Sequence, residues 1–212
     1  MKVVVAIDSL KGSLSSIEAG MAIRDGVLAA KPDAEVIVKP LADGGEGTTD
    51  ALIEGMNGKR IDLTVTGPMG TPVNAYYGYL ADSHTAVMEM ASAAGITLVP
   101  AAKKNPLLAT SYGVGEMMND ALQRGCRNFI IGIGGSATND GGIGMLKALG
   151  VRFLDENGED AGEGGQALAK VTQIDVSGLN PLLKECHIQV ACDVNNPLCG
   201  ENGSTYVYGP QK

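Results

Sequence analysis

Three times along the chain, a short apolar run leads into a polar, glycine-containing loop and then into a helical pattern. The runs lie at residues 2–7, 35–39 and 128–131, and each is too short for a helix and apolar enough for a buried strand. In the first unit, the spacing of Ser15 and Glu18 is that of a helix capping box. Repeated strand–loop–helix units predict an α/β fold with parallel strands.

The composition supports this fold class and excludes several partners. Hydrophobic residues make up 44% of the chain and aromatic residues only 4%, so we expect a core of aliphatic side chains, as in helix-covered parallel sheets. The net charge of −8, without a basic run, argues against nucleic-acid and membrane partners. No apolar stretch is long enough to span a bilayer, which predicts a cytoplasmic protein. The four cysteines contain no Cys-x-x-Cys pair, which argues against a zinc site.

The spacing of apolar residues changes between residues 61 and 90. Alternating apolar residues flank the turn at residues 67–70, a pattern typical of antiparallel strands joined by a tight turn. Helical spacing returns at residues 114–122, and residues 187–191 form a further apolar run. We therefore expect a β insertion within the α/β pattern.

The glycine-rich loop at residues 132–142 is the strongest functional candidate. A buried strand that runs into small residues and then a helix lets backbone N–H groups and the helix N-terminus approach an anion. It is not a Walker A loop or a Rossmann fingerprint, which argues against a dehydrogenase. Asn139 and Asp140 have two interpretations: they hold Mg²⁺, or Asp140 caps the helix in a plain turn. The candidate anion-binding residues are Gly134, Gly135, Ser136, Thr138, Asn139 and Asp140.

Two further loops follow predicted strands. The loop at residues 42–48 places Asp43 and Glu46 among glycines, where they would contact Mg²⁺ or a substrate hydroxyl, or cap the next helix. The loop after residue 7 offers Asp8, Lys11 and Ser13 just before a helix. Lys11 would neutralise a phosphate or carboxylate, and the alternative is a solvated surface lysine.

A fourth candidate follows the apolar run at residues 187–191. Asp193 lies just past the predicted strand, where a carboxylate can act as the base toward an alcohol. The alternative is an aspartate that starts the turn before Asn195, Asn196 and Pro197. The spacing leaves both interpretations open.

Five segments in order give the chain a close resemblance to the bacterial type I glycerate kinases, which phosphorylate D-glycerate with ATP and Mg²⁺. The segments are residues 8–13, 42–48, 132–142, 191–197 and 208–212. The resemblance implies a flavodoxin- or Rossmann-like parallel-sheet domain and a second, inserted α/β domain, with the active site between them. We expect the first domain at residues 1–65 and 85–150 and the second at 66–84 and 151–212. Family members continue beyond the last motif, so a C-terminally truncated chain is expected.

Phosphoryl transfer needs a held anion, a metal and a residue that deprotonates the attacking hydroxyl, and the candidate residues could fill these roles. Asp193 is the expected base, Lys11 offsets charge, and Asp8, Asp43 and Glu46 are alternatives as base or as Mg²⁺ ligands. Ser13 and the residues of the glycine-rich loop are expected to bind substrate or phosphate. The expected product is 2-phosphoglycerate, with 3-phosphoglycerate open. The alternative function is a fragment or relative that binds an anionic metabolite without catalysis.

Overall fold

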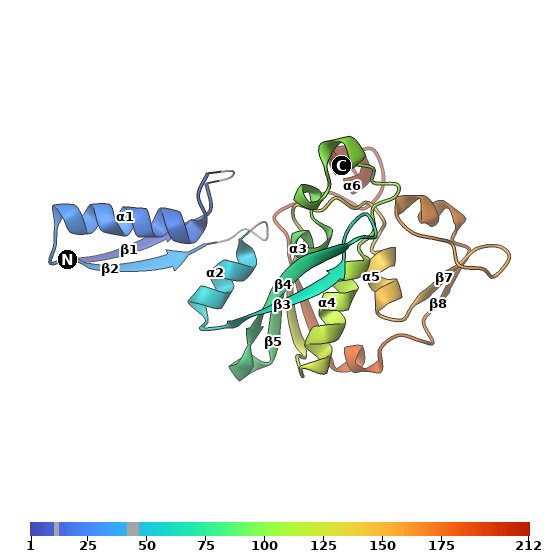
Figure 1. The fold of residues 1–212 in the computed structure, drawn as a ribbon, viewed down its shortest axis with the longest axis horizontal. Coiled ribbons are helices and arrows are strands. Elements are labelled where there is room, and N and C mark those ends of the chain that lie inside the picture. The colour runs from blue at the N-terminus through green and yellow to red at the C-terminus, as the bar shows by residue number, and fades with distance from the viewer. Residues whose placement is uncertain (11–12, 42–46) are drawn as a thin grey trace.

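A computed structural model describes residues 1–10, 13–41 and 47–212 and shows a mixed α/β chain (Figure 1). Its strands form three separate sheets, of two, five and two strands. None of the helices in these ranges combines the length and the apolar character needed to cross a membrane. The predicted α/β class is confirmed, and the sheets are of parallel, mixed and antiparallel type respectively.

The N-terminal unit consists of β1 (Lys2–Ile7), α1 (Ser16–Ala30) and β2 (Glu35–Pro40). The predicted capping box is confirmed: Ser15 Oγ accepts from the Glu18 N–H, and the Ser15 N–H donates to Glu18 Oε2 at 2.8 Å. β1 and β2 are parallel and pair only with each other within the described chain. The unit lies at one end of the molecule (Figure 1).

The central sheet contains five strands in the order β3-β4-β5-β6-β9. They are β3 (Lys59–Thr66), β4 (Pro72–Leu80), β5 (Thr85–Glu89), β6 (Asn128–Gly132) and β9 (His187–Ala191). The β3–β4 and β4–β5 pairs are antiparallel, whereas β5–β6 and β6–β9 are parallel. The antiparallel strands expected between residues 61 and 90 are therefore confirmed.

Helices cover both faces of this sheet. They are α2 (Thr48–Gly55), α3 (Met90–Ala94) and α4 (Tyr112–Gln123), and α5 (Ile143–Ala148) packs against α4. Because side chains alternate along a strand, Tyr77 of β4 points towards α4, where its hydroxyl donates to Asp120 Oδ2 at 2.6 Å. The neighbouring Gly78 faces α2, and a Cβ there would lie 2.7 Å from Ile53 Cγ1. The main core lies between α4 and the sheet.

The C-terminal third has little regular structure. It contains the hairpin of β7 (Arg152–Leu154) and β8 (Gln173–Asp175), a 3₁₀ helix at Pro181–Glu185, and α6 (Ser204–Tyr208). Lys147 of α5 holds the loop after β7 through ion pairs with Asp160 and Glu163, each at 2.8 Å.

The strand pairing groups the chain differently from the predicted domain boundaries. Residues 66–84 contain β4, which lies between β3 and β5 of one sheet. Residues 1–65 instead divide between the β1–β2 pair and β3. A tight turn at 67–70 makes β3 and β4 hydrogen-bonded neighbours, and the N–H of Gly70 donates to the carbonyl oxygen of Gly67 at 3.0 Å. The division into domains itself stays a prediction.

Two glycine-to-alanine substitutions should have opposite effects on stability. A Cβ at Gly115 in α4 would overlap the Met145 carbonyl oxygen of α5 and lie 2.7 Å from Ala148 Cβ. Gly115→Ala should therefore lower the free energy of unfolding by about 2 kcal/mol. A Cβ at Gly26, exposed in the interior of α1, would have no atom within 4 Å, so Gly26→Ala should stabilise by up to about 1 kcal/mol. Urea denaturation measures both, and equal stabilities of Gly115→Ala and the unsubstituted chain would contradict the packing.

Candidate active site

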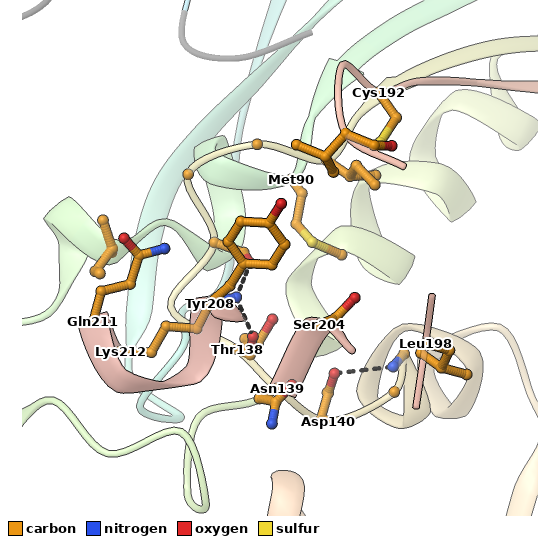
Figure 2. A pocket seen from close by; sticks show the side chains of 18 of the residues that line it. Met90, Thr138, Asn139, Asp140, Cys192, Leu198, Ser204, Tyr208, Gln211 and Lys212 are labelled. Carbon is orange, nitrogen blue, oxygen red and sulfur yellow. Dashed lines mark hydrogen bonds between the residues drawn. The ribbon is translucent and has the colours of Figure 1, made fainter. Parts of the chain in front are cut away.

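Three parallel strands of the central sheet end at the same edge. In the register of the sheet, Glu89 at the end of β5 pairs with Gly132 of β6, and Gly132 pairs with Ala191 of β9. The glycine-rich loop leaves β6 at this edge, and Asp193 lies two residues beyond β9. Ligands of α/β proteins bind beyond the carboxyl ends of parallel strands. A cavity of about 590 Å³ opens here, lined by both segments (Figure 2).

Backbone hydrogen bonds hold the glycine-rich loop against the segment at residues 94–96. The N–H of Ala137 donates to the carbonyl oxygen of Ala94, and the N–H of Ile96 donates to that of Gly135, both at 2.8 Å. The φ angles of Gly135, Gly141 and Gly142 are 68°, 60° and 78°. Residues other than glycine are strained at these positive, left-handed φ angles. The loop therefore needs glycine at these three positions to follow its path.

Asp140 is the buried anchor of the loop, with 2% of its surface exposed. Its Oδ2 accepts from the N–H and the hydroxyl of Ser111, at 2.9 and 2.7 Å, and from the N–H of Gly144 at 3.2 Å. Its Oδ1 accepts from the N–H of Gly142 at 3.0 Å. The hydroxyl of Ser111 also accepts from the N–H of Met145 at 3.0 Å.

These contacts change the predicted role of the helix that follows. We expected the N-terminus of this helix to face an anion, but the N–H groups of Gly144 and Met145 in α5 already donate to Asp140 and Ser111. The capping interpretation of Asp140 fits this geometry, because its carboxylate supplies the negative charge at the helix start. An external anion must therefore bind elsewhere on the loop.

Free backbone donors lie earlier in the loop. Within the described chain, the N–H groups of Gly134, Gly135 and Ser136 donate to no protein acceptor. All three residues line the cavity. Consecutive free N–H groups in a glycine-rich turn form a concave site for anionic oxygens. The anion-binding interpretation of Gly134, Gly135 and Ser136 therefore has a geometric basis independent of the helix.

Lys212 brings a positive charge to the same loop. Its ammonium donates to Ser136 Oγ at 2.7 Å and to the carbonyl oxygen of Thr138 at 2.6 Å. Figure 2 shows the side chain reaching from the C-terminal turn to Thr138. Burial lowers the pKa of the Lys212 ammonium, and the charge of Asp140 opposes this shift. Sequence reasoning used the motif at residues 208–212 only for the family resemblance and gave Lys212 no role.

Further hydrogen bonds join the C-terminal segment to the loop. Asn139 Nδ2 donates to Thr205 Oγ1 of α6 at 3.2 Å. The hydroxyl of Tyr208 donates to Asn196 Oδ1 at 2.6 Å, which fixes α6 against the segment that follows β9. The segment after Asp193 therefore folds back onto the glycine-rich loop. The contact of Asn139 with Thr205 joins residues 66 positions apart, so no local pattern could have predicted it.

Asp193 lines the cavity without a partner. Its side chain is exposed, and it makes no hydrogen bond or ion pair with any other described residue. A carboxylate with free oxygens at a strand end is available to accept a proton from a bound hydroxyl. The predicted position of Asp193 at the site is consistent with this geometry, and its role as base stays a prediction.

The remaining predicted residues lie in the N-terminal unit or outside the described residues. Asp8 follows β1 in the N-terminal unit, where its Oδ1 accepts from the N–H of Ser9 at 2.7 Å. Ser13 lies in the turn before α1. Neither residue lines the cavity. Lys11, Asp43 and Glu46 lie outside the described residues.

Glu89 is a buried carboxylate at the site edge that sequence reasoning missed. It is 6% exposed, and its Oε1 accepts from the N–H of Thr49 at the start of α2, at 2.7 Å. Burial raises the pKa of the Glu89 carboxyl group, while backbone donors at Thr49 and Gly47 oppose the shift. An acidic residue that ends an apolar strand is the signal that could have identified it. Glu89 joins α2 to the edge of the sheet that carries the cavity.

The sequence model of the glycerate kinase family matches residues 3–212. The chain belongs to this family. The chain is similar to the glycerate kinase of Haemophilus influenzae and to the glycerate 2-kinase of Escherichia coli, with 52% identity to each. Both alignments cover 100% of this chain and 56% of the relative.

A solved family structure agrees with the fold. A crystal structure from Salmonella typhimurium LT2, of a protein assigned as glycerate kinase 2, superposes with a TM-score of 0.91 at 51% identity. That match covers 100% of this chain and 56% of the other. The chain therefore spans about half the length of the glycerate kinases it matches.

Asp140 and Asp193 should differ sharply in their effect on stability. Asp140→Asn replaces an acceptor with an N–H₂ donor and leaves a buried N–H of the loop or of α5 unpaired, so it should lower the free energy of unfolding by about 3 kcal/mol. Asp193→Asn is the matched control and should change it by less than about 0.5 kcal/mol, because the side chain is exposed and unpartnered. Urea denaturation measures both. Equal effects of the two substitutions would contradict the anchoring role of Asp140.

Proposed function

We propose that this protein acts as an ATP-dependent glycerate kinase, with its reaction centre at the cavity between the glycine-rich loop and Asp193. The observation that carries the proposal is the shared strand edge, which brings free N–H donors, the Lys212 ammonium and an unpartnered carboxylate to one cavity. The family membership supports this class of reaction, and the names of the similar proteins support glycerate as the substrate.

Phosphoryl transfer needs a held anion and an oriented hydroxyl. In the proposed reaction, the N–H groups of residues 134–136 and the hydroxyl of Ser136 bind an anionic group, either the glycerate carboxylate or an ATP phosphate. Asp193 accepts the proton of the glycerate hydroxyl, while the oxygen of that hydroxyl forms a bond to the γ-phosphorus. The bond from the γ-phosphorus to the bridging oxygen breaks, and ADP leaves with the electron pair.

Mg²⁺ at kinase sites is bound by one or two carboxylates together with phosphates and water. The described residues offer no larger set of ligands. They contain no group of three metal-ligating side chains. Asp140 has both oxygens engaged by buried donors, so it is not a free ligand. Asp43 and Glu46 stay predicted Mg²⁺ ligands outside the described residues.

We propose 2-phosphoglycerate as the product. The name of the similar Escherichia coli protein, glycerate 2-kinase, supports transfer to the 2-hydroxyl. Phosphorus NMR of the product distinguishes the two positions. A phosphate on C2 couples to one vicinal proton and gives a doublet, whereas a phosphate on C3 couples to two and gives a triplet. A triplet would contradict the proposed position of transfer.

We also propose two α/β domains, one of them flavodoxin- or Rossmann-like. The separate parallel pairing of β1 and β2 supports placing the N-terminal unit in the Rossmann-like domain. The five-stranded sheet would then belong to the other domain. This grouping keeps each sheet within one domain, unlike the boundaries expected from the sequence.

Replacing Asp193 tests the proposed role in catalysis. Asp193→Asn cannot accept the hydroxyl proton, so kcat for glycerate-dependent ADP release should fall by about 10²- to 10⁴-fold, with little change in KM for ATP. A coupled assay for ADP measures both constants. Turnover near that of the unsubstituted protein would remove Asp193 from the mechanism.

Calorimetry and the coupled ADP assay together test whether the protein is a glycerate kinase. Calorimetric titration with D-glycerate and with ATP–Mg²⁺ shows whether each ligand binds, and the coupled assay shows whether ADP is released when both are present. Binding together with ADP release supports the kinase. Binding of either ligand without ADP release would contradict the proposed activity and would favour a protein that binds an anionic metabolite without catalysis.

A further inference from the structure

The Lys212 ammonium is half-buried, and its hydrogen-bond acceptors are neutral oxygens. Two of its three protons are donated to neutral oxygens, Ser136 Oγ and the Thr138 carbonyl. Within the described chain no carboxylate forms an ion pair with it. The nearby Asp140 is already saturated by its own donors. The charge of Asp140 attracts the ammonium without a direct contact, and a half-buried cation that no carboxylate contacts is stabilised by a ligand that supplies one.

The Lys212 ammonium lies beside the unpaired N–H donors of the glycine-rich loop. Lys212 and the free N–H groups of Gly134, Gly135 and Ser136 all line the same cavity. The contact with Ser136 Oγ brings the ammonium directly to the residue that ends the run of free donors. The third ammonium proton and these N–H groups have no acceptor among the described residues. Together they are donors of the kind that bind a carboxylate or phosphate.

We propose that Lys212 binds the anionic oxygen group of the ligand that enters the glycine-rich loop. The bound group is the glycerate carboxylate or an ATP phosphate, which share this chemistry. The inference rests on the proposed function only for the choice of these two ligands. It assigns to Lys212 the positive charge that the sequence led us to expect from Lys11.

Three substitutions separate charge from structure. Lys212→Met removes the charge and keeps an apolar chain of similar length. Lys212→Arg keeps the charge. Thr205→Val is the matched control, because it breaks the contact between α6 and Asn139 without changing any charge, and Thr205 does not line the cavity. Circular dichroism and urea denaturation confirm that each variant is folded.

Calorimetry with D-glycerate and with ATP as separate titrants gives the decisive dissociation constants. For one of the two ligands, Lys212→Met should raise Kd by about 10- to 100-fold, the loss expected for a charge-assisted hydrogen bond. Lys212→Arg should stay within about tenfold of the unsubstituted protein, and Thr205→Val within about twofold. The ligand that weakens identifies the group bound at the loop.

Three results would overturn the inference. They are unchanged Kd values for both ligands in Lys212→Met, an equal loss in Thr205→Val and Lys212→Met, or no binding of either ligand by the unsubstituted protein. The ADP assay keeps this test apart from the proposed function. Binding that depends on Lys212 without any ADP release would support the anion site and refute the kinase activity.

Discussion

Four hydrogen bonds converge on the buried carboxylate of Asp140, and through them the loop after β6 is joined to the start of α4 and to the start of α5. A buried carboxylate is tolerable because donors surround both of its oxygens. The loop has glycines in the left-handed region at three positions, and such a chain would otherwise sample many conformations. Asp140 therefore stabilises one path of the loop, and the positions of the other site residues depend on that path.

The fixed loop has consequences for charge at the cavity. Because Asp140 and Ser111 occupy the donors at the start of α5, the helix end is not available to a ligand. The unpaired donors are instead the N–H groups of residues 134–136, with the Lys212 ammonium beside them. Asp193 approaches from the neighbouring strand β9. Positive and negative groups thus reach the cavity from different segments, as the transfer of an anionic group to an alcohol requires.

The local elements were predictable because their signals are local. The strands at residues 2–7 and 128–131, the capping box at Ser15 and the antiparallel turn at 67–70 follow from periodicity and turn chemistry. The pairing of strands was harder. Nothing in the sequence of β4 states that it pairs with β5 as well as with β3, because the order of strands in a sheet leaves no local pattern.

At the candidate site too, local features could be predicted from the sequence, whereas long-range contacts could not. The glycine-rich loop and Asp193 could be found because each follows a recognisable strand. The anchoring of Asp140 by Ser111 joins residues 29 positions apart, and the contact of Lys212 with Ser136 joins residues 76 positions apart. Such contacts leave no periodic trace in a single sequence. Lys212 ended a motif that supported the family resemblance, but only the structure places its charge at the loop.

The central claim is that the glycine-rich loop and Asp193 enclose one reaction centre. A crystal structure of the protein with D-glycerate and a non-hydrolysable ATP analogue tests it most directly. We expect a carboxylate or phosphate oxygen within hydrogen-bond distance of the N–H groups of residues 134–136 and of Lys212 Nζ, and a glycerate hydroxyl within reach of the Asp193 carboxylate. Both ligands bound away from residues 132–142 and from Asp193 would contradict the account.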